Sequence, residues 1–248
     1  MIELKDVTKS FDTKTVFEKV CFKLDKGQIM GVIGPNGSGK TTLINVIMNN
    51  LDFDGQVMIE NIPNFHFIEN NRENISFVSD SPFVYDFLTG IEFIKFNLDL
   101  HRLSYKQVNS EIDALISLFS LQDYKHRLIT EYSFGMKRKI SLISTFLLKP
   151  KYFLLDEPVL GLDLKSIIAV KELLAIHAKS GSTIILSSHS FDLLENLCSK
   201  IGILHDQRVT LYENTNDMSK RELEVIYRNI IGEEIKEWLE NYSTNFPD

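Results

Sequence analysis

One segment constrains the fold of this chain more than any other, and it reads Gly34-Pro35-Asn36-Gly37-Ser38-Gly39-Lys40-Thr41-Thr42. It follows the apolar run of residues 28–33, which predicts a buried strand, and it opens a helix expected over residues 41–50. Its glycines allow backbone conformations that side chains block, and successive N–H groups at a helix start can cradle phosphate groups. Strand, glycine loop and helix are the context of a phosphate-binding loop, so a chance glycine-rich turn is the poorer interpretation.

Side chains in this loop and in a later strand predict chemistry at a bound phosphate. We expect Lys40 to reach the β- and γ-phosphates of a nucleotide and the Thr41 hydroxyl to ligate Mg²⁺. The apolar strand of residues 152–156 ends in Asp156 and is followed by Glu157. In a phosphate-loop protein such a strand delivers an acid to the metal, which is Asp156 here. Glu157 can then act as the general base that polarises the attacking water.

The periodicity of the chain predicts an α/β fold with one sheet-forming core and a helical insert. Residues 2–7 and 16–24 alternate apolar and polar side chains, as half-buried antiparallel strands do. Further strands are expected over residues 55–60 and 74–79, on either side of a loop at Pro63, and over residues 152–156, 182–187, 200–205 and 208–213. Helices expected at residues 163–179 and 190–198 alternate with strands, which predicts a parallel sheet with right-handed crossovers.

We therefore expect one domain over residues 1–216, with a phosphate-loop NTPase core and a mixed, mainly parallel sheet. An N-terminal antiparallel β subdomain belongs to the sheet core, which spans residues 1–80 and 150–213. The insert of residues 81–149 carries helical spacing of apolar side chains and forms an α-helical subdomain. Residues 217–248 form a charged helical tail.

The composition argues against a nucleic-acid partner, a membrane span and a secretory signal. The chain has 27 Lys and Arg against 34 Asp and Glu, a net charge of −7, so no nucleic-acid partner is expected. No window reaches the roughly 18 apolar residues of a membrane span, and the N-terminus does not read as a secretory signal. Cys21 and Cys198 are expected to be two buried thiols in a reducing cytosol, in preference to one disulfide.

Three more segments identify a family. Residues 132–139 read Tyr-Ser-Phe-Gly-Met-Lys-Arg-Lys, residues 160–163 read Leu-Gly-Leu-Asp, and residues 187–189 read Ser-Ser-His. With the loop and the acidic pair, these segments resemble the ATP-binding-cassette (ABC) ATPases over residues 2–213. The resemblance implies ATP and Mg²⁺ as cofactors. It also implies a signature loop with Ser133 and Gly135, a D-loop with Asp163, the switch histidine His189, and Phe11 stacked on adenine.

Two residues depart from the family pattern. Phe134 replaces the first glycine of the signature, which resembles small bacterial ABC-2-type exporter subunits. Asp80 stands where the family has a glutamine that contacts Mg²⁺, and such exporters often carry an acid there. We assign Asp80 as a metal residue, with an Asp that starts a Ser-Pro turn as the alternative.

The resemblance implies an ATP-hydrolysing subunit of an exporter, peripheral on the inner face of the cell membrane. It implies a head-to-tail ATP-sandwich dimer, homo- or heterodimeric, that drives a permease on a separate chain. Two alternatives stay open, a nucleotide-gated regulatory subunit with little turnover and the ATPase of an importer. The apolar side chains between Phe83 and Leu88 are expected either to dock the permease or to seal the helical insert against the sheet.

Overall fold

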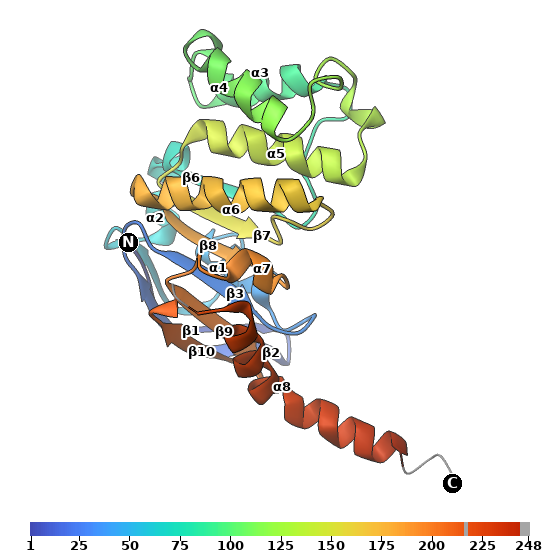
Figure 1. Ribbon diagram of the computed structural model, residues 1–248. Coiled ribbons are helices and arrows are strands. Elements are labelled where there is room, and N and C mark those ends of the chain that lie inside the picture. Colours follow the sequence, from blue (N-terminus) through green and yellow to red (C-terminus); the bar gives the residue numbers. More distant parts are fainter. Residues whose placement is uncertain (216–217, 244–248) are drawn as a thin grey trace.

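A computed structural model describes residues 1–215 and 218–243 and contains two sheets (Figure 1). The first is a four-stranded antiparallel sheet near the N-terminus, in the order β2-β1-β4-β5. Its strands are β1 (Ile2–Phe11), β2 (Lys14–Leu24), β4 (Asp54–Ile59) and β5 (Ile62–Pro63). The predicted antiparallel β subdomain is thereby confirmed.

The second sheet has six strands in the order β10-β9-β3-β8-β7-β6, and only β10 is antiparallel to its neighbour. These are β3 (Ile29–Ile33), β6 (Ile75–Val78), β7 (Tyr152–Asp156), β8 (Thr183–Ser187), β9 (Lys200–His205) and β10 (Arg208–Glu213). Strands β3, β7 and β8 are buried along their whole length, which explains their apolar sequences. Because all three are parallel, their carboxyl ends meet at one edge of the sheet.

Eight α-helices connect and flank these strands within the described residues (Figure 1). They are α1 (Lys40–Ile47), α2 (Asn64–Asn70), α3 (Gly90–Leu100), α4 (Tyr105–Leu118), α5 (Phe134–Leu148), α6 (Leu164–Lys179), α7 (Phe191–Leu194) and α8 (Lys220–Ser243). Helices α3, α4 and α5 form the helical insert at one end of the molecule, and α8 projects from the other end. A search of the described helices finds none that is long and apolar enough to cross a membrane.

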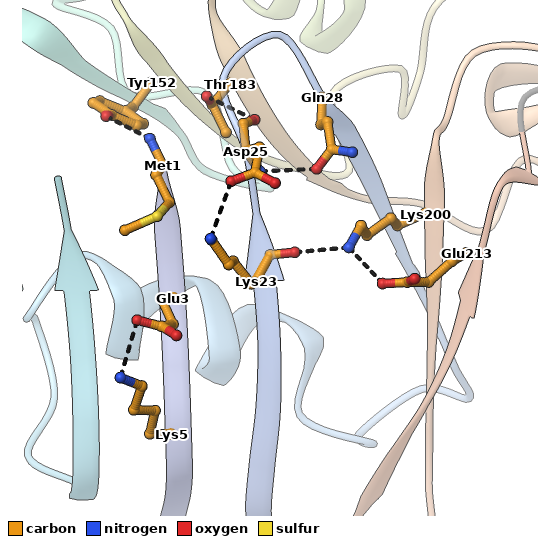
Figure 2. A network of polar contacts seen from close by, with 10 residues as sticks. All are labelled: Met1, Glu3, Lys5, Lys23, Asp25, Gln28, Tyr152, Thr183, Lys200 and Glu213. Atoms are coloured by element: carbon orange, nitrogen blue, oxygen red, sulfur yellow. Dashed lines mark hydrogen bonds and ion pairs between the residues drawn. The ribbon is translucent and has the colours of Figure 1, made fainter. Parts of the chain in front are cut away.

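Polar contacts fasten the N-terminal strands to the core sheet (Figure 2). The Lys200 ammonium donates to the carbonyl oxygen of Lys23 at 2.9 Å and to Glu213 at 2.5 Å. The Thr183 hydroxyl donates to the carbonyl oxygen of Asp25 at 3.3 Å. These bonds join Lys23 of β2 to β9, and Asp25, directly after β2, to β8, so they connect the antiparallel sheet to the core sheet.

Some local predictions were wrong. The expected loop at Pro63 contains β5 and α2, because the buried Asn64 amide anchors α2 to the end of α1 through the carbonyl oxygens of Val46 and Ile47. Helix α7 ends at Leu194 instead of continuing to residue 198. Cys21 is exposed, whereas Cys198 is buried as expected, and both thiols are free. Of the predicted tail, residue 217 and residues 244–248 lie outside the described part.

Candidate functional site

A cleft of about 760 Å³ lies at the carboxyl edge of the core sheet, and we call it the loop cleft. It gathers side chains from segments that are far apart in the sequence. Its lining includes most of the predicted site residues, namely Phe11, Asn36, Gly37, Ser38, Gly39, Lys40, Thr41, Thr42, Asp80, Asp156, Glu157 and His189. Gly34 and Pro35 begin the same loop. The predicted residues Ser133, Gly135 and Asp163 do not line the cleft.

The glycine loop folds into a cradle because two of its positions exclude a side chain. Gly39, directly before α1, has φ +108°, and a Cβ there would lie 2.4 Å from Val16 Cγ1. Gly34 packs against the end of β9, where a Cβ would lie 2.3 Å from the carbonyl oxygen of Leu204. The loop can therefore hold its backbone close to the start of α1, where N–H groups lack helical partners.

Lys40 is the cation of this cradle. Its side chain is 7% exposed, and its ammonium donates to the carbonyl oxygens of Gly34 at 3.0 Å and Pro35 at 3.1 Å. Burial lowers the pKa of Lys40, while the charges of Glu157 and Asp156 act in the opposite direction. The ammonium thus folds back over the loop at the point where a phosphate would lie.

Asp156 and Thr41 meet across the cleft. The Thr41 hydroxyl donates to Asp156 Oδ2 at 2.6 Å, and the Ser187 hydroxyl donates to Asp156 Oδ1. Among the described residues no group of three or more Asp, Glu, His or Cys side chains could hold a metal by itself. Mg²⁺ usually takes one or two protein oxygens and completes its shell with water and phosphate oxygens, so the Thr41–Asp156 pair fits that ion.

Glu157 and His189 lie beside this pair. Glu157 follows β7 with φ 46°, and its Oε1 lies 3.3 Å from His189 Nε2. Its other carboxylate oxygen accepts a hydrogen bond from the backbone N–H of His189 at 3.3 Å. The carboxylate therefore lines the cleft next to the metal pair, where a water molecule and a γ-phosphate can reach it.

Asp80 was expected either to contact the metal or to start a Ser-Pro turn. The residue lies in the loop after β6, is exposed and lines the cleft. Its Oδ1 accepts a hydrogen bond from the N–H of the next residue, Ser81, at 2.7 Å. Asp80 thus lines the cleft, and its carboxylate contacts the backbone of the following residue.

Phe11 lies at the mouth of the cleft, at the end of β1. Its ring is 46% exposed, and the Lys9 ammonium lies 4.5 Å from the ring centroid. An exposed aromatic face at the end of a cleft offers a surface on which a nucleotide base can stack.

The signature residues pack against the D-loop of the same chain. Ser133 caps α5 and accepts a hydrogen bond from the Met136 N–H at 3.3 Å. A Cβ on Gly135 would lie 2.6 Å from the carbonyl oxygen of Gly161, and a Cβ on Gly161 would lie 2.8 Å from the Phe134 ring. The Phe134 ring is 46% exposed. The Phe134 ring thus fills the space over Gly161 of the D-loop, and Ser133 keeps its position as the cap of α5.

Three consecutive basic residues of α5 bind three neighbouring loops, a role that was not predicted from the sequence. Lys137 donates to Asp86 at 2.6 Å, the buried Arg138 guanidinium donates to the carbonyl oxygens of Ser79 and Asp80, and Lys139 donates to Asp163 at 2.5 Å. The Lys139 bond lowers the pKa of Asp163 to about 2, and hydrogen bonds from Ser166 add to it. A run of basic residues reads as a solvated face, so no sequence signal distinguishes these three bonds.

Comparison with known proteins places the chain in a family. The sequence profile described as ABC transporter matches residues 17–160. An uncharacterized ABC transporter ATP-binding protein, YhcH of Bacillus subtilis (strain 168), is 31% identical over 220 residues, which cover 88% of this chain and 71% of that protein.

Solved structures agree with this assignment. An ATP-binding subunit of an ABC transporter superposes with a TM-score of 0.79 at 29% identity, over 86% of this chain and 90% of that one. The ATP-binding cassette MJ0796, solved as a dimer in a post-hydrolysis state with ADP and Pi, has the same fold, with a TM-score of 0.76 at 21% identity over 86% of this chain and 98% of that one. The profile, the relative and the predicted motifs agree, and the chain belongs to the ABC transporter family.

Proposed function

We propose that this ABC ATPase binds ATP with Mg²⁺ in the loop cleft and hydrolyses it there to drive a separate membrane-spanning permease. The observation that carries the proposal is the convergence of Lys40, Thr41, Asp156 and Glu157 on one cleft at the carboxyl edge of the core sheet. The test is phosphate release by the purified chain with MgATP, with EDTA as the control. Tight ATP binding without release, alone or with the permease, would instead favour the regulatory alternative.

The chain's own residues divide the work on the phosphates. The N–H groups of the glycine loop and the Lys40 ammonium bind the phosphate oxygens, and the Thr41 hydroxyl and the Asp156 carboxylate hold the metal. When bound, Mg²⁺ neutralises charge on the phosphate oxygens. The Glu157 carboxylate accepts a proton from the attacking water, and His189, 3.3 Å away, orients that carboxylate.

A dimer completes the site. Ser133, Gly135 and Asp163 lie outside the chain's own cleft, so they can serve a nucleotide only in the cleft of a second subunit. The exposed rings and side chains of Phe134, Leu160 and Leu164 lie around them and offer apolar area for such a contact. The dimer of the MJ0796 cassette supports this arrangement. The second subunit is another copy of this chain or a related ATPase.

Phe11→Ala is expected to weaken ATP and GTP binding alike, because stacking uses the face of any purine. A base–aromatic stack contributes about 1–3 kcal/mol in nucleic-acid complexes, so we expect affinity to fall by roughly 5- to 150-fold. Titration with fluorescent analogues of both nucleotides measures the effect. Phe65→Ala is the control, because its ring is also about half exposed but lies outside the cleft. Loss of ATP binding alone would point to hydrogen-bond recognition of adenine instead.

The permease is proposed to dock at a groove of about 450 Å³ between β6, α3 and α5. Phe83 and Phe93 line it, and Phe83 is 74% exposed. The neighbouring Tyr85 is half-buried and contacts the rings of Phe83, Phe87, Phe93 and Phe96 at centroid distances of 5.2–6.3 Å. The two aromatic residues thus differ in role. Phe83 is exposed and can receive a helix of the permease, whereas Tyr85 packs within the helical insert.

Phe83→Ala is expected to abolish co-purification with the membrane-spanning permease, while ATPase activity and melting temperature stay unchanged. Tyr85→Ala removes the centre of the ring cluster and should cost about 2 kcal/mol of stability, a fall of roughly 4–8 °C in melting temperature. Ile176→Ala, also more than half exposed but on α6, is the control. Retained co-purification of the Phe83 variant would move the docking surface elsewhere.

Export is the proposed direction of transport, with the chain on the cytoplasmic face of the membrane. The Phe-Gly-Met form of the signature and the acid at position 80 support an exporter of the ABC-2 type. Transport assays in sealed vesicles, with ATP on either side, decide the direction.

A further inference from the structure

Ser187 lies between the two acids of the site, but it takes part in none of the chemical steps proposed for them. It is the last residue of β8 and is fully buried. In the parallel pairing of β7 with β8 its Cα is the register partner of Asp156. The residue is therefore fixed by the core sheet directly beside the point where β7 delivers its carboxylate.

The Ser187 hydroxyl contacts both acids at once. It donates its proton to Asp156 Oδ1 and accepts the backbone N–H of Glu157 at 3.0 Å. A hydroxyl can donate one hydrogen bond and accept others, so both contacts are satisfied together. One buried oxygen atom thus connects the metal acid to the backbone of the general base.

The bond to Glu157 matters because of the backbone conformation of that residue. Glu157 has φ 46°, in the left-handed region that a non-glycine residue rarely adopts. Since β7 ends at Asp156, the Glu157 N–H has left the strand ladder and takes the Ser187 hydroxyl as its partner. Without this acceptor, a poorly exposed N–H would lose its hydrogen bond in a strained turn.

The bond to Asp156 fixes the rotation of the carboxylate. With Oδ1 held by Ser187, the other oxygen, Oδ2, faces the Thr41 hydroxyl at 2.6 Å. The hydrogen bond to Oδ1 limits rotation of the carboxylate and keeps Oδ2 on the side of Thr41. Partners of this kind behind a metal ligand are known to tune metal affinity.

We propose that Ser187 is a positioning residue that aims Asp156 Oδ2 at the metal and holds the turn that presents Glu157. The inference rests on the proposed roles of those two acids. The pairing of β7 with β8 thereby positions both acids through one side chain.

The test compares Ser187→Ala with Ser188→Ala in the full chain. Ser188 is equally buried, and its hydroxyl accepts only the Ser190 N–H at 2.9 Å among the hydrogen bonds described. Ser187→Ala should lower kcat by about 10- to 100-fold and raise the Mn²⁺ dissociation constant, measured by electron paramagnetic resonance with ADP, about tenfold. Affinity for ADP in EDTA should stay unchanged. Ser188→Ala should stay within about twofold of the wild type in every measurement.

Two results would overturn the inference. The first is an unchanged Mn²⁺ dissociation constant in Ser187→Ala. The second is an equal loss of ADP affinity in EDTA, which would mean that the substitution disturbs the whole cleft. If Ser187→Ala does not fold, Ser187→Cys keeps the volume with a weaker hydrogen-bonding group and should change the same two quantities in the same direction. Asp156→Asn and Glu157→Gln run in parallel, and full activity in both would reject the proposed function instead.

Discussion

Glu157→Gln is expected to leave ATP binding intact and to lower hydrolysis by about 100-fold or more, since general-base catalysis contributes about 10²–10⁴ in rate. The amide has the size of the carboxylate but cannot accept the proton of the attacking water. The carboxylate lies at the cleft, 3.3 Å from His189 Nε2, and none of the hydrogen bonds described joins it to the glycine loop. Phosphate release and a fluorescent ATP titration measure the two expectations separately.

The same variant should become a stable dimer in MgATP, because the nucleotide that closes the sandwich is no longer consumed. Size-exclusion chromatography with and without MgATP detects this change. Glu172→Gln, on the exposed side of α6, makes the same chemical change outside the cleft and should behave as the wild type. Turnover above about a tenth of the wild-type rate in the Glu157 variant would remove that residue from the role of base.

The sheet could be predicted from the sequence because its strands carry local signals. Strands β3, β7 and β8 are buried on both faces, so each reads as an unbroken apolar run. The end of β1 could not be predicted, because bulges break the alternation of its apolar and polar side chains. The pairing of β1 with β2 shifts register after Leu4 and again after Val7, and Asp6 and Lys19 have positive φ. The structure extends β1 to Phe11, which carries that ring to the cleft.

The candidate site, too, could be predicted from the sequence only in part. The glycine loop and the acidic pair are contiguous motifs, and the structure places both at the loop cleft as expected. Ser187 and Arg138 act through partners about 30 and 60 residues away in sequence, and only the strand register and the packing of α5 reveal those contacts. Such bonds depend on tertiary placement, which a single sequence does not state.

Arg138 shows why composition alone misleads here. Its guanidinium is fully buried, and burial lowers its pKa while Asp80, Asp156 and Glu157 act to raise it. A buried charge is costly unless it is paired and hydrogen-bonded. The carbonyl oxygens of Ser79 and Asp80 supply those bonds, so the helical insert and the Asp80 loop are held together by a residue that reads as surface in the sequence.

Lys40→Ala is expected to weaken nucleotide binding itself. Among the hydrogen bonds described, the buried ammonium donates to the carbonyl oxygens of Gly34 and Pro35, and it can turn from these neutral acceptors to phosphate oxygens. A hydrogen bond to a charged group contributes about 1.5–3 kcal/mol, which corresponds to a loss of roughly 10- to 150-fold in ATP affinity. The fluorescent ATP titration that serves for Glu157→Gln measures this loss.

Lys14→Ala is the matched control, because Lys14 lines the same cleft but is exposed. Solvent and salt screen an exposed ammonium, so this variant should lose less than about fivefold in affinity. The melting temperature without nucleotide checks whether loss of the Gly34 and Pro35 bonds has instead unfolded the loop. An equal effect of both lysines would mean that general positive charge attracts the nucleotide. Unchanged affinity in Lys40→Ala would mean that the glycine loop does not hold its phosphates.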